Sequence, residues 1–125
     1  MKLKFFVLYF LPIILFMGII FYFSSIPYPP TLEIKYSADY EHIFEYFLLS
    51  FLLYRGFRNS RYNNIVFSLA ILITVVYGIS DEMHQYFILG RTFDFFDMGF
   101  DAIGACLILP IRFLEKNRYF RKYFL

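Results

Sequence analysis

The feature that most constrains this chain is an apolar run from Phe5 to Phe23 that contains no charged residue. A bilayer core is about 30 Å thick and takes about 20 apolar residues per spanning helix. The run is longer than the apolar part of a signal peptide, and the residues after it, Ser24 to Pro27, are a poor cleavage site. We therefore expect an uncleaved first spanning helix, kinked where Pro12 removes a backbone hydrogen bond.

The rest of the chain is also strongly apolar, because 60% of its 125 residues are hydrophobic and 18% are charged. A soluble domain of this length needs a more polar surface. We predict an all-α, polytopic membrane protein with four transmembrane helices in a small bundle and a short amphipathic C-terminal tail. Cys106 lies in an apolar stretch, and we expect it to be a buried packing residue. The predicted single domain is 1–125, with helices at about 4–24, 39–56, 64–88 and 93–114.

The charged residues are distributed unevenly, and this predicts an orientation in the membrane. Ten of the twelve basic residues fall on one side of the four predicted spans, and nine of the ten acidic residues fall on the other. Because the basic side faces the cytoplasm, both termini are predicted to be cytoplasmic in a multi-pass protein of the bacterial cytoplasmic membrane. We expect the basic, aromatic tail from Arg112 to Leu125 to lie on the inner leaflet rather than to bind nucleic acid.

Several acidic residues fall deep inside the predicted spans, where charge is costly. At a helical rise of about 1.5 Å per residue, Glu45 lies ~15 Å above Arg55, and Asp101 lies ~16 Å above Arg112. The stretch from Ser80 to Asp101 alone holds five of the ten acidic residues. These positions predict a polar cavity that opens outward and has its floor near Glu45 and Asp101.

The polar residues of this outer half are the candidate functional residues. Carboxyl and imidazole groups can act as general acids or bases, and an arginine can hold a phosphate or carboxylate. The candidate catalytic residues are Glu45, Asp81, Glu82, His84, Asp97 and Asp101. The candidate binding residues are His42, Tyr77, Gln85, Arg91 and Asp94.

Each of these candidates also has a structural alternative. The carboxylates could form a hydrogen-bonded core that joins helix to helix. Asp94 and Asp97 lie near a predicted helix start, where capping is a strong rival role. Arg91 could equally bridge to Asp94 on the surface. Ser24, Ser25 and Ser80 are not expected to be nucleophiles, because no Ser-His-acid spacing is present.

The two histidines come from different predicted helices, and each shares a helix face with a carboxylate. If a metal binds, His42 and His84 with Asp101 would supply its ligands and leave a position open. The alternative is that each histidine is hydrogen-bonded to Glu45 or Asp81 as a structural or proton-shuttling pair. No cofactor and no oligomeric state follow from the sequence.

The longest motif, Tyr77 to Ala105, reads YGISDEMHQYFILGRTFDFFDMGFDAIGA. It resembles the signature of the VanZ-like membrane proteins, the teicoplanin-resistance protein family. His42 to Tyr46 and the leucine run after it resemble the family's second-helix element, and Phe23 to Ser25 resemble the end of its first helix. Two positions depart from the pattern: Asp39 stands where many members carry lysine, and Gly78 replaces the usual alanine.

The resemblance implies a bacterial envelope protein connected with resistance to the glycopeptide teicoplanin, and membrane lipids are its expected partners. Three functions fit the residues. The first is a non-enzymatic protein that binds a lipid, a glycopeptide or a lipid-linked wall precursor at the polar site. The second is a small intramembrane enzyme, acid–base or metal-assisted, acting on an envelope lipid or cell-wall precursor. The third is a proton- or cation-coupled carrier.

Overall fold

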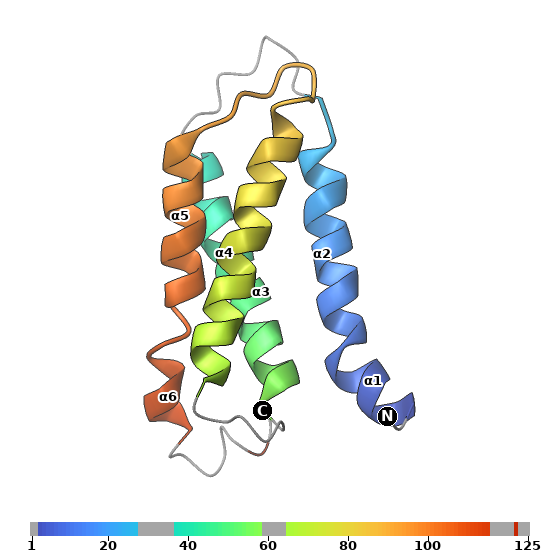
Figure 1. The fold of residues 1–125 in the computed structure, drawn as a ribbon, viewed down its shortest axis with the longest axis vertical. Coiled ribbons are helices and arrows are strands. Elements are labelled where there is room, and N and C mark those ends of the chain that lie inside the picture. The colour runs from blue at the N-terminus through green and yellow to red at the C-terminus, as the bar shows by residue number, and fades with distance from the viewer. Residues whose placement is uncertain (1–2, 28–36, 59–64, 116–121, 123–125) are drawn as a thin grey trace.

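The computed structural model describes residues 3–27, 37–58, 65–115 and 122, and their regular structure is helical throughout, as predicted. Helices α2 to α5 stand side by side as a bundle, with α1 and α6 at one end of it (Figure 1). The helices are α1 Leu3–Tyr9, α2 Leu11–Ser24, α3 Ser37–Phe57, α4 Val66–Gln85, α5 Phe95–Cys106 and α6 Ile111–Leu114.

The first apolar segment is broken near its start. Helices α1 and α2 together cover Leu3–Ser24, with an irregular turn at Phe10 between them. Pro12 lies in the first turn of α2 and has no N–H to donate to the preceding turn. The break therefore falls where Pro12 is expected to disturb the helix.

The last predicted helix is shorter than expected. A single helix over 93–114 is wrong, because α5 ends at Cys106 and a turn separates it from the four residues of α6. Pro110 has no N–H for the Cys106 carbonyl, which accepts instead from the Leu109 N–H at 3.0 Å. The third predicted helix also ends early, at Gln85, before a turn in which Gly90 adopts a φ of 81°.

Two helical segments are long and apolar enough to cross a membrane by length and composition, namely Leu3–Ser24 and Val66–Gln85. Helix α3 has sufficient length but carries Glu41, Glu45 and Arg55. Helix α5 has 12 residues, which corresponds to about 18 Å at 1.5 Å per residue. Four spans therefore stay a prediction.

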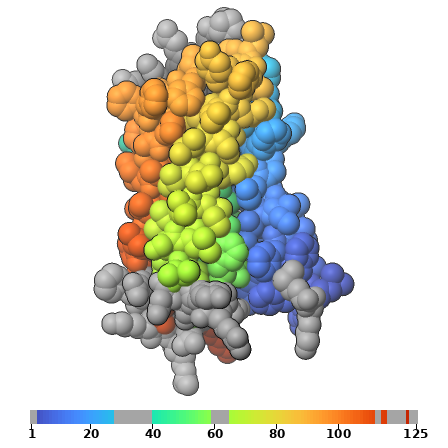
Figure 2. Space-filling view, viewed as in Figure 1, coloured from blue at the N-terminus to red at the C-terminus, as the bar shows by residue number. Residues whose placement is uncertain are grey.

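Helix α3 packs against both α4 and α5, and its buried face supplies much of the core. Figure 2 shows α2, α4 and α5 packed side by side into an elongated body. Many apolar side chains on the outward faces are exposed, which suits a surface that meets lipid. Examples are Leu15, Ile19, Leu72, Val76 and Ile103.

The end of the bundle that carries α6 is joined by polar contacts. Glu115 accepts a hydrogen bond from the Tyr54 hydroxyl and pairs with Arg58, whose Nε lies 3.3 Å away. The amphipathic tail predicted beyond this point lies outside the described residues, apart from Lys122.

Candidate polar site between α3, α4 and α5

A histidine–carboxylate pair joins α3 to α5. Nδ1 of His42 lies 2.8 Å from Oδ1 of Asp101, and the two side chains are 14% and 3% exposed. The His42 ring stacks on Tyr46, one turn further along α3, with an interplanar angle of 2°. This stacking and the bond to Asp101 together determine the orientation of the imidazole.

The close approach of α3 and α5 depends on Gly104, one turn after Asp101. A Cβ at Gly104 would collide with the backbone carbonyl of Ile43, next to His42. Ser50 adds a second link between the helices, since its hydroxyl donates to the Ala105 carbonyl at 3.0 Å. The glycine therefore permits the helix spacing at which the histidine reaches Asp101.

Glu82 brings a third helix to the same place. Its side chain on α4 is fully buried, and Oε2 accepts a hydrogen bond from the backbone N–H of Asp94 at 3.1 Å. Asp94 in turn caps α5, because its Oδ1 accepts from the Phe96 N–H at 2.8 Å. The capping role that rivalled ligand binding for Asp94 is thus present.

Three buried polar atoms in this region have no hydrogen-bond partner among the described residues: the Tyr46 hydroxyl, Oε1 of Glu82 and Oδ2 of Asp101. Leaving such a group unpaired costs about 1–3 kcal/mol, and it is rare in folded proteins. Gly78 of α4 closes over the same atoms, because a Cβ there would come within 2.7 Å of the Asp101 Oδ2.

Asp97 completes the group from the first turn of α5, where it is half-buried. One potential ligand atom from each of His42, Glu82 and Asp97 lies within 4.8 Å of the other two. We call His42, Tyr46, Glu82, Asp97 and Asp101 the polar centre. Its members come from three helices, so that only the folded chain assembles it.

A second polar region joins α2 to α4. Asp81 accepts hydrogen bonds at both carboxylate oxygens, from the Ser24 hydroxyl at 2.7 Å and from the Gln85 amide at 2.9 Å. All three side chains are buried. We call Ser24, Asp81 and Gln85, with Arg91, the α2–α4 junction.

Arg91 ties the turn after α4 to the end of α2. It donates to the carbonyl of Phe23 at 2.9 Å, to that of Ile26 at 3.3 Å and to Oε1 of Gln85 at 3.4 Å. Arg91 and Gln85, which were predicted as binding residues, therefore connect α4 and the turn after it to α2.

His84 also faces α2. Its Nε2 lies 2.9 Å from the Ser25 hydroxyl, and its ring stacks on Phe21 with centroids 4.4 Å apart. The predicted metal set of both histidines with Asp101 is therefore corrected, because His84 points to α2 while His42 points to α5. Of the two histidines, His42 belongs to the group of potential metal ligands that the described residues form, and His84 does not.

Two further candidates lie outside both groups. The Tyr77 hydroxyl donates to the Met17 carbonyl at 2.7 Å and so links α4 to α2. Glu45 is half-buried on α3, three residues after His42. The candidate site residues predicted from the sequence did not include Tyr46 or Ser24. Helical spacing was an available signal for Tyr46, because it follows His42 by four residues and therefore shares its face.

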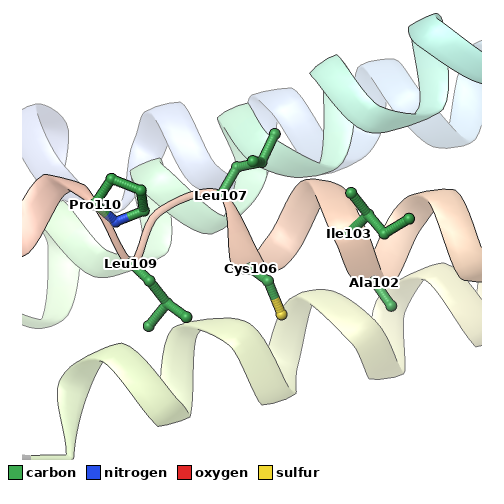
Figure 3. A pocket seen from close by; sticks show the side chains of 6 residues that line it. All are labelled: Ala102, Ile103, Cys106, Leu107, Leu109 and Pro110. Atoms are coloured by element: carbon green, nitrogen blue, oxygen red, sulfur yellow. The ribbon is translucent and has the colours of Figure 1, made fainter.

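The grooves on the surface of the described residues differ from the outward polar cavity that the sequence predicts. Two grooves on the described residues are lined almost entirely by apolar atoms. One, of about 550 Å³, follows α5 and the turn after it (Figure 3), and Cys106, expected to be buried, is exposed there. The polar residues are enclosed because the helices pack directly over them, as Gly78 and Gly104 allow.

The fold and the site define a class of protein. A helical chain with apolar outer faces and buried ionisable groups between its helices is typical of an integral membrane protein. The family model described as VanZ/LLP1 matches residues 6–114, and the chain belongs to this family. Family and apolar helices together indicate a membrane protein.

The chain is also similar to a protein of a eukaryote. An uncharacterized protein of the fission yeast Schizosaccharomyces pombe is 32% identical over 96 residues. The aligned region covers 76% of this chain and 58% of the yeast protein, so the chain spans little more than half of that relative's length. No solved structure matches the chain.

Proposed function

We propose that this VanZ-family chain is a four-span membrane protein with both ends in the cytoplasm, and that its polar centre binds the headgroup of a membrane lipid or lipid-linked envelope molecule. The observation that carries the proposal is the set of unpartnered buried atoms on Tyr46, Glu82 and Asp101. A headgroup that donates hydrogen bonds to these atoms would offset their desolvation.

The four-span topology is supported by the placement of the helices. Helices α2 to α5 form one bundle, and α1 and α6 lie at the same end of it (Figure 1). The turn and α6 extend the short α5, so that residues 95–114 together approach the length of a span.

Access to the centre is expected from the side where α5 begins. Asp94, Asp97 and His42 are half-buried there, while Glu82 and Asp101 are buried behind them. The half-buried groups would meet a ligand first, and the buried carboxylates would bind its innermost polar atoms. Carboxylate oxygens accept hydrogen bonds, so amine- and hydroxyl-bearing headgroups fit better than a bare phosphate.

The yeast relative favours a lipid common to many membranes over a ligand restricted to bacterial walls. Phosphatidylethanolamine offers the required ammonium group on a widespread lipid. In its more specific form, the proposal is that the protein contributes to teicoplanin-type resistance in a bacterial envelope. In that form, lipid binding at the outer leaflet would change how a glycopeptide gathers at the cell surface.

Thermal unfolding of the detergent-purified chain tests lipid binding. We expect added phosphatidylethanolamine to raise Tm more than phosphatidylcholine or phosphatidylglycerol, because a ligand at 100 times its Kd stabilises by about 2.7 kcal/mol. Asp101→Asn should abolish the difference, and His84→Ala, outside the polar centre, should keep it. Equal shifts for all three lipids, or a preference unaffected by Asp101→Asn, would refute the proposal.

An enzyme acting on the same lipid is the second candidate, favoured by the His42–Asp101 pair. A carboxylate that orients an imidazole is a common arrangement for general base catalysis. Incubating the purified chain with labelled phosphatidylethanolamine and analysing the products decides between the candidates. Release of a headgroup by the wild type and its loss in His42→Ala would establish an enzyme, whereas intact lipid would leave binding as the activity.

A further inference from the structure

The polar centre has the donor set of a metal site. His42, Glu82 and Asp97 each place one ligand atom within 4.8 Å of the other two. Metal bonds of about 2.0–2.2 Å hold neighbouring ligands about 3–4 Å apart, so the three atoms need to shift by about an ångström or less. Asp97 lies in the first turn of α5, where it is half-buried.

The contact between His42 and Asp101 prepares the imidazole for a cation. Nδ1 of His42 lies 2.8 Å from Oδ1 of Asp101, and an ionised Asp101 would accept the Nδ1 proton, so that the neutral imidazole would present the lone pair of Nε2 to a cation. Metal-binding histidines usually donate their other ring N–H to a carboxylate or carbonyl in this way. The parallel stacking on Tyr46 adds a second restraint on the ring.

Glu82 supplies an independent observation. Its side chain is 0% exposed, Oε2 is bonded to the Asp94 N–H, and Oε1 has no partner among the described residues. An unpaired carboxylate oxygen in a protein interior carries a large desolvation cost, which a bound cation removes.

From these observations we propose that His42, Glu82 and Asp97 bind a divalent transition metal ion, zinc or manganese, between α3, α4 and α5. One imidazole and two carboxylates match the ligand preferences of these ions, and three protein ligands leave a position open. Asp101 acts as a positioning residue that orients His42. The proposal deepens the proposed function, since it assigns an occupant to the same centre.

The ion and a lipid headgroup would use different atoms of the centre. An ion bound at Oε1 of Glu82 would leave the Tyr46 hydroxyl and Oδ2 of Asp101 for a headgroup, since neither has a hydrogen-bond partner among the described residues. An ion with an open position would also attract the phosphate of a bound lipid, which the carboxylates alone repel.

The test measures metal content of the full-length chain in detergent. The protein is stripped with a chelator, dialysed against zinc or manganese alone, and assayed by mass spectrometry of the metal. We expect a single ion per chain in the wild type, and its loss in His42→Ala and in the nearly isosteric Glu82→Gln. Asp101→Asn should weaken affinity by about 10–100-fold, as for other residues that orient a metal-bound histidine.

His84→Ala is the matched control, because it removes the other histidine and leaves the polar centre intact. It should bind metal like the wild type, and circular dichroism should show helical folding in every variant. A folded wild type that retains neither metal overturns the proposal without needing any variant. So does metal that persists in folded Glu82→Gln and His42→Ala, or that disappears in His84→Ala.

The two proposals fail separately. Metal binding with no preference among lipids would support the ion site and refute headgroup binding. A lipid preference that survives in chelator-stripped protein with no affinity for zinc or manganese would do the reverse.

Discussion

The polar centre and the α2–α4 junction hold similar residues at neighbouring positions but differ in how their polar atoms are used. Each contains a buried carboxylate on α4, and these two residues, Asp81 and Glu82, are adjacent in sequence. Both oxygens of Asp81 are hydrogen-bonded, while Oε1 of Glu82 has no partner among the described residues. Adjacent residues on a helix point about 100° apart, so they meet different neighbours.

This difference separates a joint from a site. In the α2–α4 junction the protein supplies partners for its own buried groups, which joins the helices. In the polar centre three buried atoms have no hydrogen-bond partner among the described residues. A helix joint is expected to lose stability when its polar residues change, whereas a binding site is expected to lose function.

The largest effect is expected where α3 meets α5. Gly104→Ala places a Cβ against the Ile43 carbonyl, and backbone cannot yield as a side chain does. We expect a loss of about 3 kcal/mol or more in the free energy of unfolding, at or above the usual range for overpacking. Denaturant unfolding in detergent measures it.

Gly99→Ala is the control on the same helix, because a Cβ there meets nothing within 4 Å. It should be neutral or stabilise α5 by up to about 1 kcal/mol through helix propensity. Equal effects of the two alanines would mean that the close contact between α3 and α5 is absent.

The adjacent carboxylates provide the second comparison. Asp81→Asn replaces an oxygen that accepts a hydrogen bond by an amide that cannot, and should cost about 1–3 kcal/mol in the free energy of unfolding. Glu82→Gln should leave stability close to that of the wild type, since Oε1 has no protein partner to lose. Thermal or denaturant unfolding of metal-free protein checks both. The reverse order would remove the distinction between joint and site.

Two tyrosines allow a smaller version of the same test. Tyr77→Phe removes the hydrogen bond to the Met17 carbonyl and should cost about 1 kcal/mol. Tyr46→Phe removes a buried hydroxyl without a partner among the described residues and should be neutral or slightly stabilising. The difference between the two unfolding free energies is the measured quantity, and a larger cost for Tyr46→Phe would contradict the assignment.

The smallest effect is expected outside both polar regions. Cys106 is exposed in the apolar groove along α5 (Figure 3). Cys106→Ala should change the free energy of unfolding by less than about 0.5 kcal/mol, as for most surface substitutions. A larger loss would show that this face is packed against something in the membrane.

Local sequence signals predicted a good part of the fold. Long apolar runs indicated helices, and Pro12 marked the break before α2. The fourth helix was predicted to be too long. Pro110 indicates the break, because it has no N–H to donate to the Cys106 carbonyl. Seven of the eleven candidate residues lie in the polar centre or the α2–α4 junction, and this division into two groups was not predicted.

Sequence alone determined that this chain is helical and apolar outside, and that ionisable residues collect toward one end of its helices. These properties follow from composition and from the 3.6-residue period, which are local. Tertiary structure alone decided that His42 meets Asp101 while His84 meets Ser25. The reason is that the rotation and spacing of neighbouring helices depend on contacts between residues far apart in the chain, such as Gly104 with Ile43.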